Sequence, residues 1–380
     1  MSFKFLIACG GTGGHLAPGI ALADALQARG HTTILFISEK KVDARLCEKY
    51  PALTAVPVPG SPFSWRPVRL LRFGWCQVKG LRFSLNYLRQ YQPDAIVGFG
   101  GFTNTGIVLA GRLRKVPVAL HEANRVPGRA IRVLSRIAHR LYLPPGVRLP
   151  GRLGLLVRHT GLPVRAEVRR ISRTEARAIL GVDPLQKLLV IVGGSQGSGP
   201  LNRWVDANLE GLAREGVQVW CVTGLGNGEA KVRELQTKSG AVIRAWFEPF
   251  TDRVGALFSA ADLVLSRAGA GTLAELVRCE TPAILVPYPF AANDHQRANA
   301  LHFEQQGGGV VVHETALATL RQEVSDVLFN DWLINKFRAN LRRMAEENTI
   351  ETMVQDLEAL ARRDPPGGQS KSTNALLPAA

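Results

Sequence analysis

Three glycine-rich segments of the chain could bind an anionic ligand. Each follows a short apolar run of the kind that forms a buried strand, and they cover residues 10–14, 98–101 and 193–197. Glycine loops between a strand and a helix let backbone N–H groups approach an anion, with the helix dipole behind them. One such loop taken alone is weak evidence, because a tight turn between strand and helix uses the same residues. Three of them favour a ligand site at the carboxyl ends of parallel strands.

The first loop matches a dinucleotide-binding sequence only in part. In the pattern Gly-x-Gly-x-x-Gly starting at Gly11, Leu16 occupies the third glycine position, although Glu39 lies roughly where an acidic residue would bind a ribose. The loop also ends at His15, which puts an imidazole at the start of the expected helix. A dehydrogenase therefore stays a rival interpretation. A phosphate loop of the ATPase type is excluded, because no loop ends in Gly-Lys-Ser/Thr.

A second chemical signature lies further along the chain. Residues 266–275 follow an apolar run and begin a helical pattern of small residues, with Glu275 one to two turns inside it. Small residues let backbone amides reach a ligand, and a carboxylate can accept two hydrogen bonds from a ribose diol. The amides and carboxylates of residues 293–299 suit sugar hydroxyls, or simply cap an exposed helix.

Positive charge is concentrated in the first part of the chain. The formal net charge is +16, and residues 1–165 contain 24 Lys and Arg against six Asp and Glu, whereas residues 166–380 contain 23 against 25. Such asymmetry indicates a local anionic partner, which could be a membrane, a nucleic acid or a substrate. The hydrophobic share of 46% and charged share of 21% exclude a disordered or fibrous protein.

The basic residues are mixed with aromatic ones. Residues 49–93 contain no acidic residue and seven basic ones, interleaved with side chains such as Trp65 and Trp75. This mixture suits the headgroup layer of an anionic membrane. A further acid-free stretch contains four arginines whose spacing predicts one shared helix face: Arg129, Arg132, Arg136 and Arg140. A solvated helix or nucleic-acid binding would use similar residues, but no nucleic-acid module is recognisable.

The cysteines and apolar runs bear on the compartment. Five scattered cysteines without a Cys-x-x-Cys pair argue against a disulfide framework or a zinc site, and fit a reducing compartment. The apolar stretch before Cys9 is about four residues, shorter than the roughly 7–15 of an export signal. No run reaches the roughly 18 apolar residues of a membrane span without interrupting glycines.

The order of the expected elements predicts two similar α/β halves. Strands are expected at residues 3–9, 33–37, 95–97, 116–121, 187–192, 217–223, 241–245, 263–266 and 283–286, with helices at 20–28, 201–212 and 332–363. Strands that alternate with helices form parallel sheets. We expect a first domain at 1–163, a second at 164–340, a hinge near 161–164 and a disordered tail at 364–380.

Together these motifs resemble the MurG family of bacterial N-acetylglucosaminyltransferases. Residues 11–15 (GTGGH) with Pro18 and Gly19 are similar to the family's first glycine loop, and residues 121–124, 193–197, 266–275 and 294–296 match its later motifs in order. The resemblance covers about residues 3–360. It implies the GT-B glycosyltransferase fold, in which two Rossmann-like domains face each other across a cleft. It also implies that a C-terminal helix, about 341–363, returns to the first domain.

The resemblance implies an activity and its partners. The family moves N-acetylglucosamine from UDP-N-acetylglucosamine to the 4-hydroxyl of the muramyl sugar on undecaprenyl diphosphate, inverting the linkage, in peptidoglycan synthesis. A metal ion or tightly bound cofactor is not expected, nor is a nucleic-acid partner. The basic half would lie on anionic inner-leaflet phospholipid, at the cytoplasmic face of the cell membrane, as a peripheral protein.

The resemblance also assigns site residues. His15 is the candidate general base, which Glu122 would orient or assist. The donor sugar would contact Asn124 and Gln296. The cleft near the transferred sugar and the acceptor diphosphate would be lined by Thr12, Gly13 and Gly14. The expected contacts of UDP are Arg165, Ser195, Thr251, Ala270, Gly271, Thr272, Leu273, Ala274 and Glu275, with Glu275 on the ribose and Thr251 near the uracil.

Three departures from the family pattern are visible. Leu162 and Ala123 stand where the family usually has Asn and Gln, and the second glycine loop lacks a later proline after Asn104. The last departure bears on the acceptor side. Two rival functions stay open: a diacylglycerol glycosyltransferase of the same fold, and a nucleotide-sugar-binding protein that would need no His15.

Overall fold

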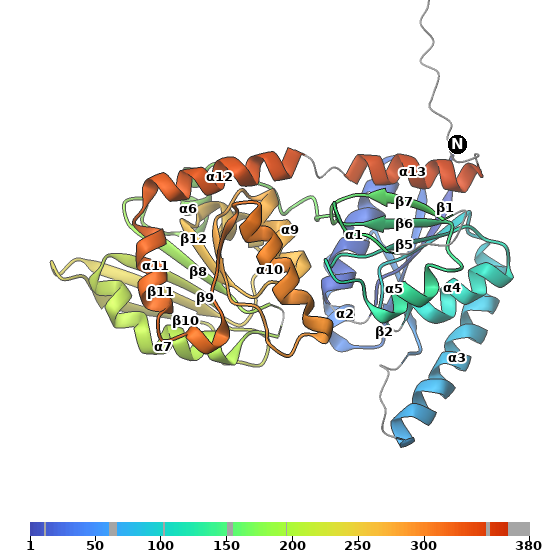
Figure 1. The fold of residues 1–380 in the computed structure, drawn as a ribbon, viewed down its shortest axis with the longest axis horizontal. Coiled ribbons are helices and arrows are strands. Elements are labelled where there is room, and N and C mark those ends of the chain that lie inside the picture. Colours follow the sequence, from blue (N-terminus) through green and yellow to red (C-terminus); the bar gives the residue numbers. More distant parts are fainter. Residues whose placement is uncertain are drawn as a thin grey trace, which may run out of the picture.

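Two seven-stranded sheets lie side by side, and helices cover both of them (Figure 1). The structure, a computed structural model, describes residues 1–10, 13–60, 67–101, 103–149, 155–194, 196–346 and 350–363. The strand order is β3-β2-β1-β4-β5-β6-β7 in the first sheet and β10-β11-β9-β8-β12-β13-β14 in the second. Among the described strands, only β10 and β11 pair antiparallel. The predicted arrangement of two parallel α/β halves is confirmed.

The first sheet is formed by strands that lie between residues 4 and 159. They are β1 (Lys4–Ala8), β2 (Thr32–Ser38), β3 (Thr54–Val58), β4 (Ala95–Gly98), β5 (Val118–His121), β6 (Arg140–Leu143) and β7 (Leu156–His159). The accompanying helices are α1 (Gly13–Ala28), α2 (Lys41–Cys47), α3 (Pro67–Tyr91), α4 (Asn104–Leu113) and α5 (Arg129–Leu134).

The second sheet is formed by strands that lie between residues 187 and 311. They are β8 (Lys187–Val192), β9 (Val217–Val222), β10 (Lys231–Gln236), β11 (Val242–Glu248), β12 (Leu263–Ser266), β13 (Ala283–Leu285) and β14 (Gly309–Val311). The helices are α6 (Arg173–Leu180), α7 (Gly199–Arg214), α8 (Val254–Ala260), α9 (Ala270–Arg278), α10 (His295–Gln305), α11 (Leu320–Leu328), α12 (Asp331–Glu346) and α13 (Ile350–Arg362), with 3₁₀ turns at Ala292–Asp294 and Glu314–Ala316.

The central strands have unbroken apolar sequences because both of their faces are buried. Phe5 and Ile7 pack with α1 on one face of β1, whereas Leu6 and Ala8 belong to the cluster on the other face. The second sheet likewise carries one apolar cluster on each face. The carboxyl end of each central strand is therefore held firmly, and the loop that follows it starts from a fixed point.

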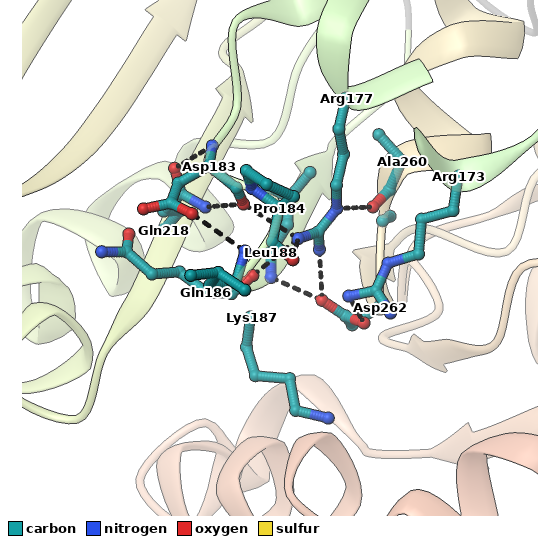
Figure 2. A network of polar contacts seen from close by, with 12 residues as sticks. Arg173, Arg177, Asp183, Pro184, Gln186, Lys187, Leu188, Gln218, Ala260 and Asp262 are labelled. Carbon is teal, nitrogen blue, oxygen red and sulfur yellow. Dashed lines mark hydrogen bonds and ion pairs between the residues drawn. The ribbon is translucent and has the colours of Figure 1, made fainter. Parts of the chain in front are cut away.

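A buried arginine fixes the amino ends of two strands in the second sheet (Figure 2). Arg177 of α6 is 2% exposed and donates to the carbonyls of Asp183, Pro184 and Gln186, at 2.8–2.9 Å, just before β8. Its Nη2 lies 2.7 Å from Asp262 Oδ2, and the same oxygen accepts from Leu188 N. Burial lowers the pKa of Arg177, and Asp262 opposes that shift. The network joins α6 to β8 and β12 at the edge away from the glycine loops.

The last two helices run along one side of both halves (Figure 1). α12 packs against α9 of the second half, whereas α13 packs against α1 of the first. On α13, Glu358 accepts hydrogen bonds from Arg29 Nε and His31 Nε2, both at 2.8 Å. Residues 341–346 thus end α12, and the return to the first half starts at Ile350 rather than near 341 as expected. The other predicted domain limits stay predictions, and the tail 364–380 lies outside the described residues.

One sequence interpretation is wrong. The four arginines expected on one helix face do not share a helix, because α5 ends at Leu134 and Arg140 starts β6. Residues 140–143 are buried between β5 and β7, so tertiary packing outweighs the helical spacing. Arg140 is 7% exposed and its Nε lies 3.4 Å from Asp356 on α13.

Candidate active site between the two sheets

His15 lies in the first turn of α1, directly against the second glycine loop. A Cβ added to Gly100 would lie 3.3 Å from His15 Nε2, and one added to Gly101 would lie 3.5 Å from Nδ1. These two glycines have φ values of +96° and +80°, which favour glycine. The two glycine loops of the first sheet therefore form one surface, with the imidazole between them.

The surroundings of His15 keep its ring neutral. Burial lowers the pKa of His15 to about 4, while the carboxylate of Asp43 acts to raise it and His295 and Lys40 act to lower it. Asp43 itself, in the first turn of α2, is fully buried and accepts a hydrogen bond from Ser38 Oγ at the end of β2. A neutral imidazole at pH 7 has the protonation state that a proton acceptor needs.

Glu122 holds the loop after β5. Its Oε1 accepts hydrogen bonds from the backbone and side-chain nitrogens of Asn124, at 2.9 and 3.1 Å, and its Oε2 accepts from Gly128 N at 2.7 Å. The side chain is 5% exposed. Both carboxylate oxygens are thus used to shape the segment 122–128. A positioning role follows from these contacts, and a direct catalytic role for Glu122 stays a prediction.

Asn124 connects the two halves through Asn299 of α10. Asn299 Nδ2 donates to Asn124 Oδ1 at 3.1 Å and to Ala268 O at 3.2 Å, and its Oδ1 accepts from Arg125 N at 2.9 Å. Asn299 is 3% exposed. Asn124, which is expected to contact the donor sugar, is therefore held in place by residues of both halves. Asn299 belongs to the polar segment noted in the sequence, but only the fold reveals its contacts with Asn124 and Arg125.

Arg165 and Glu275, both expected to contact UDP, lie against each other. Arg165 Nη2 is 3.3 Å from Glu275 Oε1, and Arg165 Nη1 is 3.3 Å from the hydroxyl of Tyr50. Glu167 accepts a hydrogen bond from Tyr50 and lies 3.5 Å from Arg165. Burial raises the pKa of Glu275, and Arg165 opposes that shift. Sequence reasoning missed Tyr50 and Glu167, which carry no motif of their own.

Other predicted residues lie at the start of α9 or in neighbouring loops. Ala270, Gly271 and Thr272 form the first turn of α9, where the N-cap Gly269 leaves the backbone N–H groups without a side-chain cap. Gln296 Oε1 accepts from Tyr288 N at 2.9 Å, and Thr251 Oγ1 accepts from Arg253 N at 3.3 Å.

The last of the predicted residues contribute little to this geometry. Gly13 and Gly14 start α1, and Leu273 and Ala274 line a cavity between the halves. Thr12 and Ser195 lie outside the described residues.

In the described part of the chain, no three His, Cys, Asp or Glu side chains gather closely enough to hold a metal ion.

Comparison with known proteins decides the family. Residues 5–143 match the glycosyltransferase family 28 N-terminal domain, and residues 188–353 match the glycosyltransferase family 28 C-terminal domain. A relative from Opitutus terrae is 60% identical over 98% of this chain and 99% of its own length. It is named UDP-N-acetylglucosamine–N-acetylmuramyl-(pentapeptide) pyrophosphoryl-undecaprenol N-acetylglucosamine transferase. The chain belongs to the MurG family.

A second relative agrees with MurG membership, and two solved structures share the fold. A relative of the same name from Parasynechococcus marenigrum is 35% identical over 94% of this chain and 99% of its own. The crystal structure of Acinetobacter baumannii MurG superposes with a TM-score of 0.70 at 24% identity, covering 94% of this chain and 99% of that one. The glycosyltransferase of kitacinnamycin has a TM-score of 0.69 at 15% identity, covering 95% and 100%. The expected GT-B fold is confirmed.

Proposed function

We propose that the chain transfers N-acetylglucosamine from UDP to the 4-hydroxyl of the muramyl sugar on undecaprenyl diphosphate, in peptidoglycan synthesis. The carrying observation is the 60% identity, over nearly the whole chain, to a relative named for this reaction. That relative's name specifies a muramyl pyrophosphoryl-undecaprenol acceptor, which favours this acceptor over diacylglycerol. The first half supplies a neutral imidazole and the second half supplies a helix that starts with small residues. This combination is consistent with catalysis rather than with binding alone.

The donor would occupy the second half. Backbone N–H groups at the start of α9 would face the diphosphate, whose negative charge suits the positive end of the helix dipole. Arg165 would turn from Glu275 to the leaving phosphate and stabilise its charge, while Glu275 binds the ribose hydroxyls. Asn124 and Gln296 would bind the sugar, and Ser195 and Thr251 would complete the UDP site.

The acceptor would approach from the first half. Thr12, Gly13 and Gly14 would lie near its diphosphate. Neutral His15 would take the proton of the 4-hydroxyl while the hydroxyl oxygen attacks the anomeric carbon and the bond to the UDP oxygen breaks. This single displacement inverts the linkage. Nearby phosphate charge would raise the pKa of His15 from about 4 and strengthen it as a base.

A membrane-facing surface for the acceptor's lipid would be carried by α3, which projects away from the first sheet (Figure 1). Leu71, Trp75 and Val78 are 77%, 58% and 46% exposed and follow the spacing of one helix face. Lys79 Nζ lies 5.0 Å from the centre of the Trp75 ring. No helix in the described residues is both long and apolar enough to cross a membrane. The exposed apolar residues and Lys79 of α3 support peripheral attachment to anionic phospholipid, which we place at the cytoplasmic face as part of this proposal.

A direct transfer assay tests the function. The protein is incubated with UDP carrying labelled N-acetylglucosamine and either an undecaprenyl-diphosphate-linked muramyl peptide or diacylglycerol. Label should move to the muramyl lipid and not to diacylglycerol. Transfer to diacylglycerol alone, or binding of UDP without transfer to either lipid, would contradict the proposal.

Vesicle binding tests the membrane surface. Changing Leu71, Trp75 and Val78 to serine together should release the protein from anionic vesicles, whereas Leu185→Ser should not. Leu185 is a suitable control because it is 93% exposed but lies in the second half. Binding should also weaken with salt through screening of the basic residues. Equal attachment of the triple variant and the control would remove α3 from the membrane surface.

A further inference from the structure

A cavity of about 420 Å³ lies between the two halves, beside the proposed nucleotide site. The first half contributes the segments after β5, β6 and β7, and the second half contributes α9, α10 and Met344 of α12. Leu273, Ala274 and Val277 of α9 form part of its wall, whereas Glu275 points to Arg165. Its volume is within the range of small-molecule sites.

Two buried polar atoms in the lining have no partner among the described residues. They are Nδ1 of His121 and Oγ1 of Thr160, whose residues are 1% and 8% exposed. His121 Nε2 lies 3.3 Å from the carbonyl oxygen of Gly161, and a carbonyl only accepts, so Nε2 carries the hydrogen. Nδ1 is therefore an acceptor. A buried acceptor without a donor is destabilising, which a ligand N–H or O–H would relieve.

One side of the cavity carries a guanidinium and an imidazole. Arg125 and His302 both line it and both are half-buried. Arg125 Nη1 donates to Pro145 O at 2.6 Å, and in the described part of the chain no carboxylate lies within ion-pair distance of its guanidinium. Burial lowers the pKa of His302, and the charge of Arg125 lowers it further. An anionic group here would pair with the Arg125 guanidinium, and its charge would raise the pKa of His302.

We propose that this interdomain cavity binds an amphipathic organic anion. Its apolar body would pack against Leu273, Phe303 and Met344, a hydrogen-bond donor would meet Nδ1 of His121, and its anionic group would lie at Arg125 and His302. The cavity adjoins the donor site of the proposed function without coinciding with it. Ala270, Leu273 and Ala274 of α9, which are expected contacts of UDP, form part of its wall, whereas Glu275 of the same helix is held by Arg165. Because its walls come from both halves, an occupant binds best to one arrangement of the sheets and would stabilise it.

The probe for this site is 8-anilinonaphthalene-1-sulfonate, which combines aromatic rings, one N–H donor and a sulfonate. Fluorescence titration of the full chain should reveal a site that Met344→Trp weakens at least tenfold and Met344→Ala retains. His121→Phe and Arg125→Met should each weaken it about tenfold, the worth of one hydrogen bond to a charged or buried partner. Gln305→Trp, on the exposed side of α10, is the matched control and should bind as the unmodified chain does.

Saturating UDP and a crystal structure with the probe decide the location. UDP should leave the probe bound, and the rings should lie between α9 and the ends of β5–β7. Displacement by UDP would assign the probe to the nucleotide site, and rings found only on α3 would assign it to the membrane surface. Either result overturns the proposal, as does unchanged affinity in Met344→Trp. None of these measurements depends on turnover, so they are independent of the proposed reaction.

Discussion

Replacing Glu275 by alanine should abolish the preference of the protein for UDP over 2′-deoxy-UDP. Glu275 Oε1 is engaged by Arg165 at 3.3 Å, so the carboxylate keeps Oε2 and further lone pairs for a ribose diol. A hydrogen bond to a charged group contributes about 1.5–3 kcal/mol. In the unmodified chain, loss of the 2′-hydroxyl should therefore weaken binding by roughly 10–100-fold. In Glu275→Ala, the two nucleotides should bind within about threefold of each other.

Calorimetric titration with UDP and 2′-deoxy-UDP measures this ratio. The matched control is Glu167→Ala, because Glu167 is also a carboxylate near Arg165, at 3.5 Å, but its side chain is 45% exposed. It removes the same charge and should keep the preference for UDP. A folded Glu275→Ala protein that still discriminates against 2′-deoxy-UDP would show that Glu275 does not hold the ribose. Loss of discrimination in the control would show that charge alone sets the ratio.

Three other variants test the base, the core and the effect of pH. His15→Ala should lower turnover by about 10²–10⁴-fold while UDP affinity is unchanged, and a loss of only a fewfold would reassign the base. Arg177→Met should lower the free energy of unfolding in urea by about 3 kcal/mol, because Asp262 loses a buried partner, whereas the partly exposed Arg173→Met should change it by about 1 kcal/mol or less. Burial lowers the pKa of His121 from 6.5 to about 4, so the unfolded chain takes up a proton at a higher pH than the folded chain does. The free energy of unfolding should therefore fall by up to about 3 kcal/mol as the pH drops from about 6.5 to about 4. Urea unfolding of His121→Asn at pH 7.5 and 4.5 should show a smaller pH dependence, and an equal dependence would contradict this account.

Apolar runs were sufficient to predict the buried central strands, because burial on both faces leaves a visible signal in the sequence. The edge strand β10 (Lys231–Gln236) was missed because four of its six residues are polar and almost all of them are exposed. β6 was missed for a different reason: its first residue, Arg140, is a buried charge that makes sense only beside Asp356, which is 216 positions away. Long-range pairing of this kind leaves no local pattern.

The candidate site likewise combines features that local sequence predicts with contacts that it does not predict. The glycine loops and the start of α9 follow from local sequence, and the structure places them at strand ends as expected. The contacts between Asn124 and Asn299, and between Tyr50 and Arg165, join residues that lie more than 100 positions apart. The cavity beside α9 combines several segments and has no sequence signature at all.

The packing of α13 has a consequence for synthesis of the chain. Met353, Val354 and Leu357 are almost fully buried in the core of the first half, yet the ribosome adds them only after every strand of the second sheet. About 200 residues separate the last strand of the first sheet from this helix, which takes roughly 10–40 s at the usual rate of translation. During that time the first half exposes an apolar groove beside α1, where a chaperone or another nascent chain can bind. The first half, although it is synthesised first, thus completes its core only after α13 has been made.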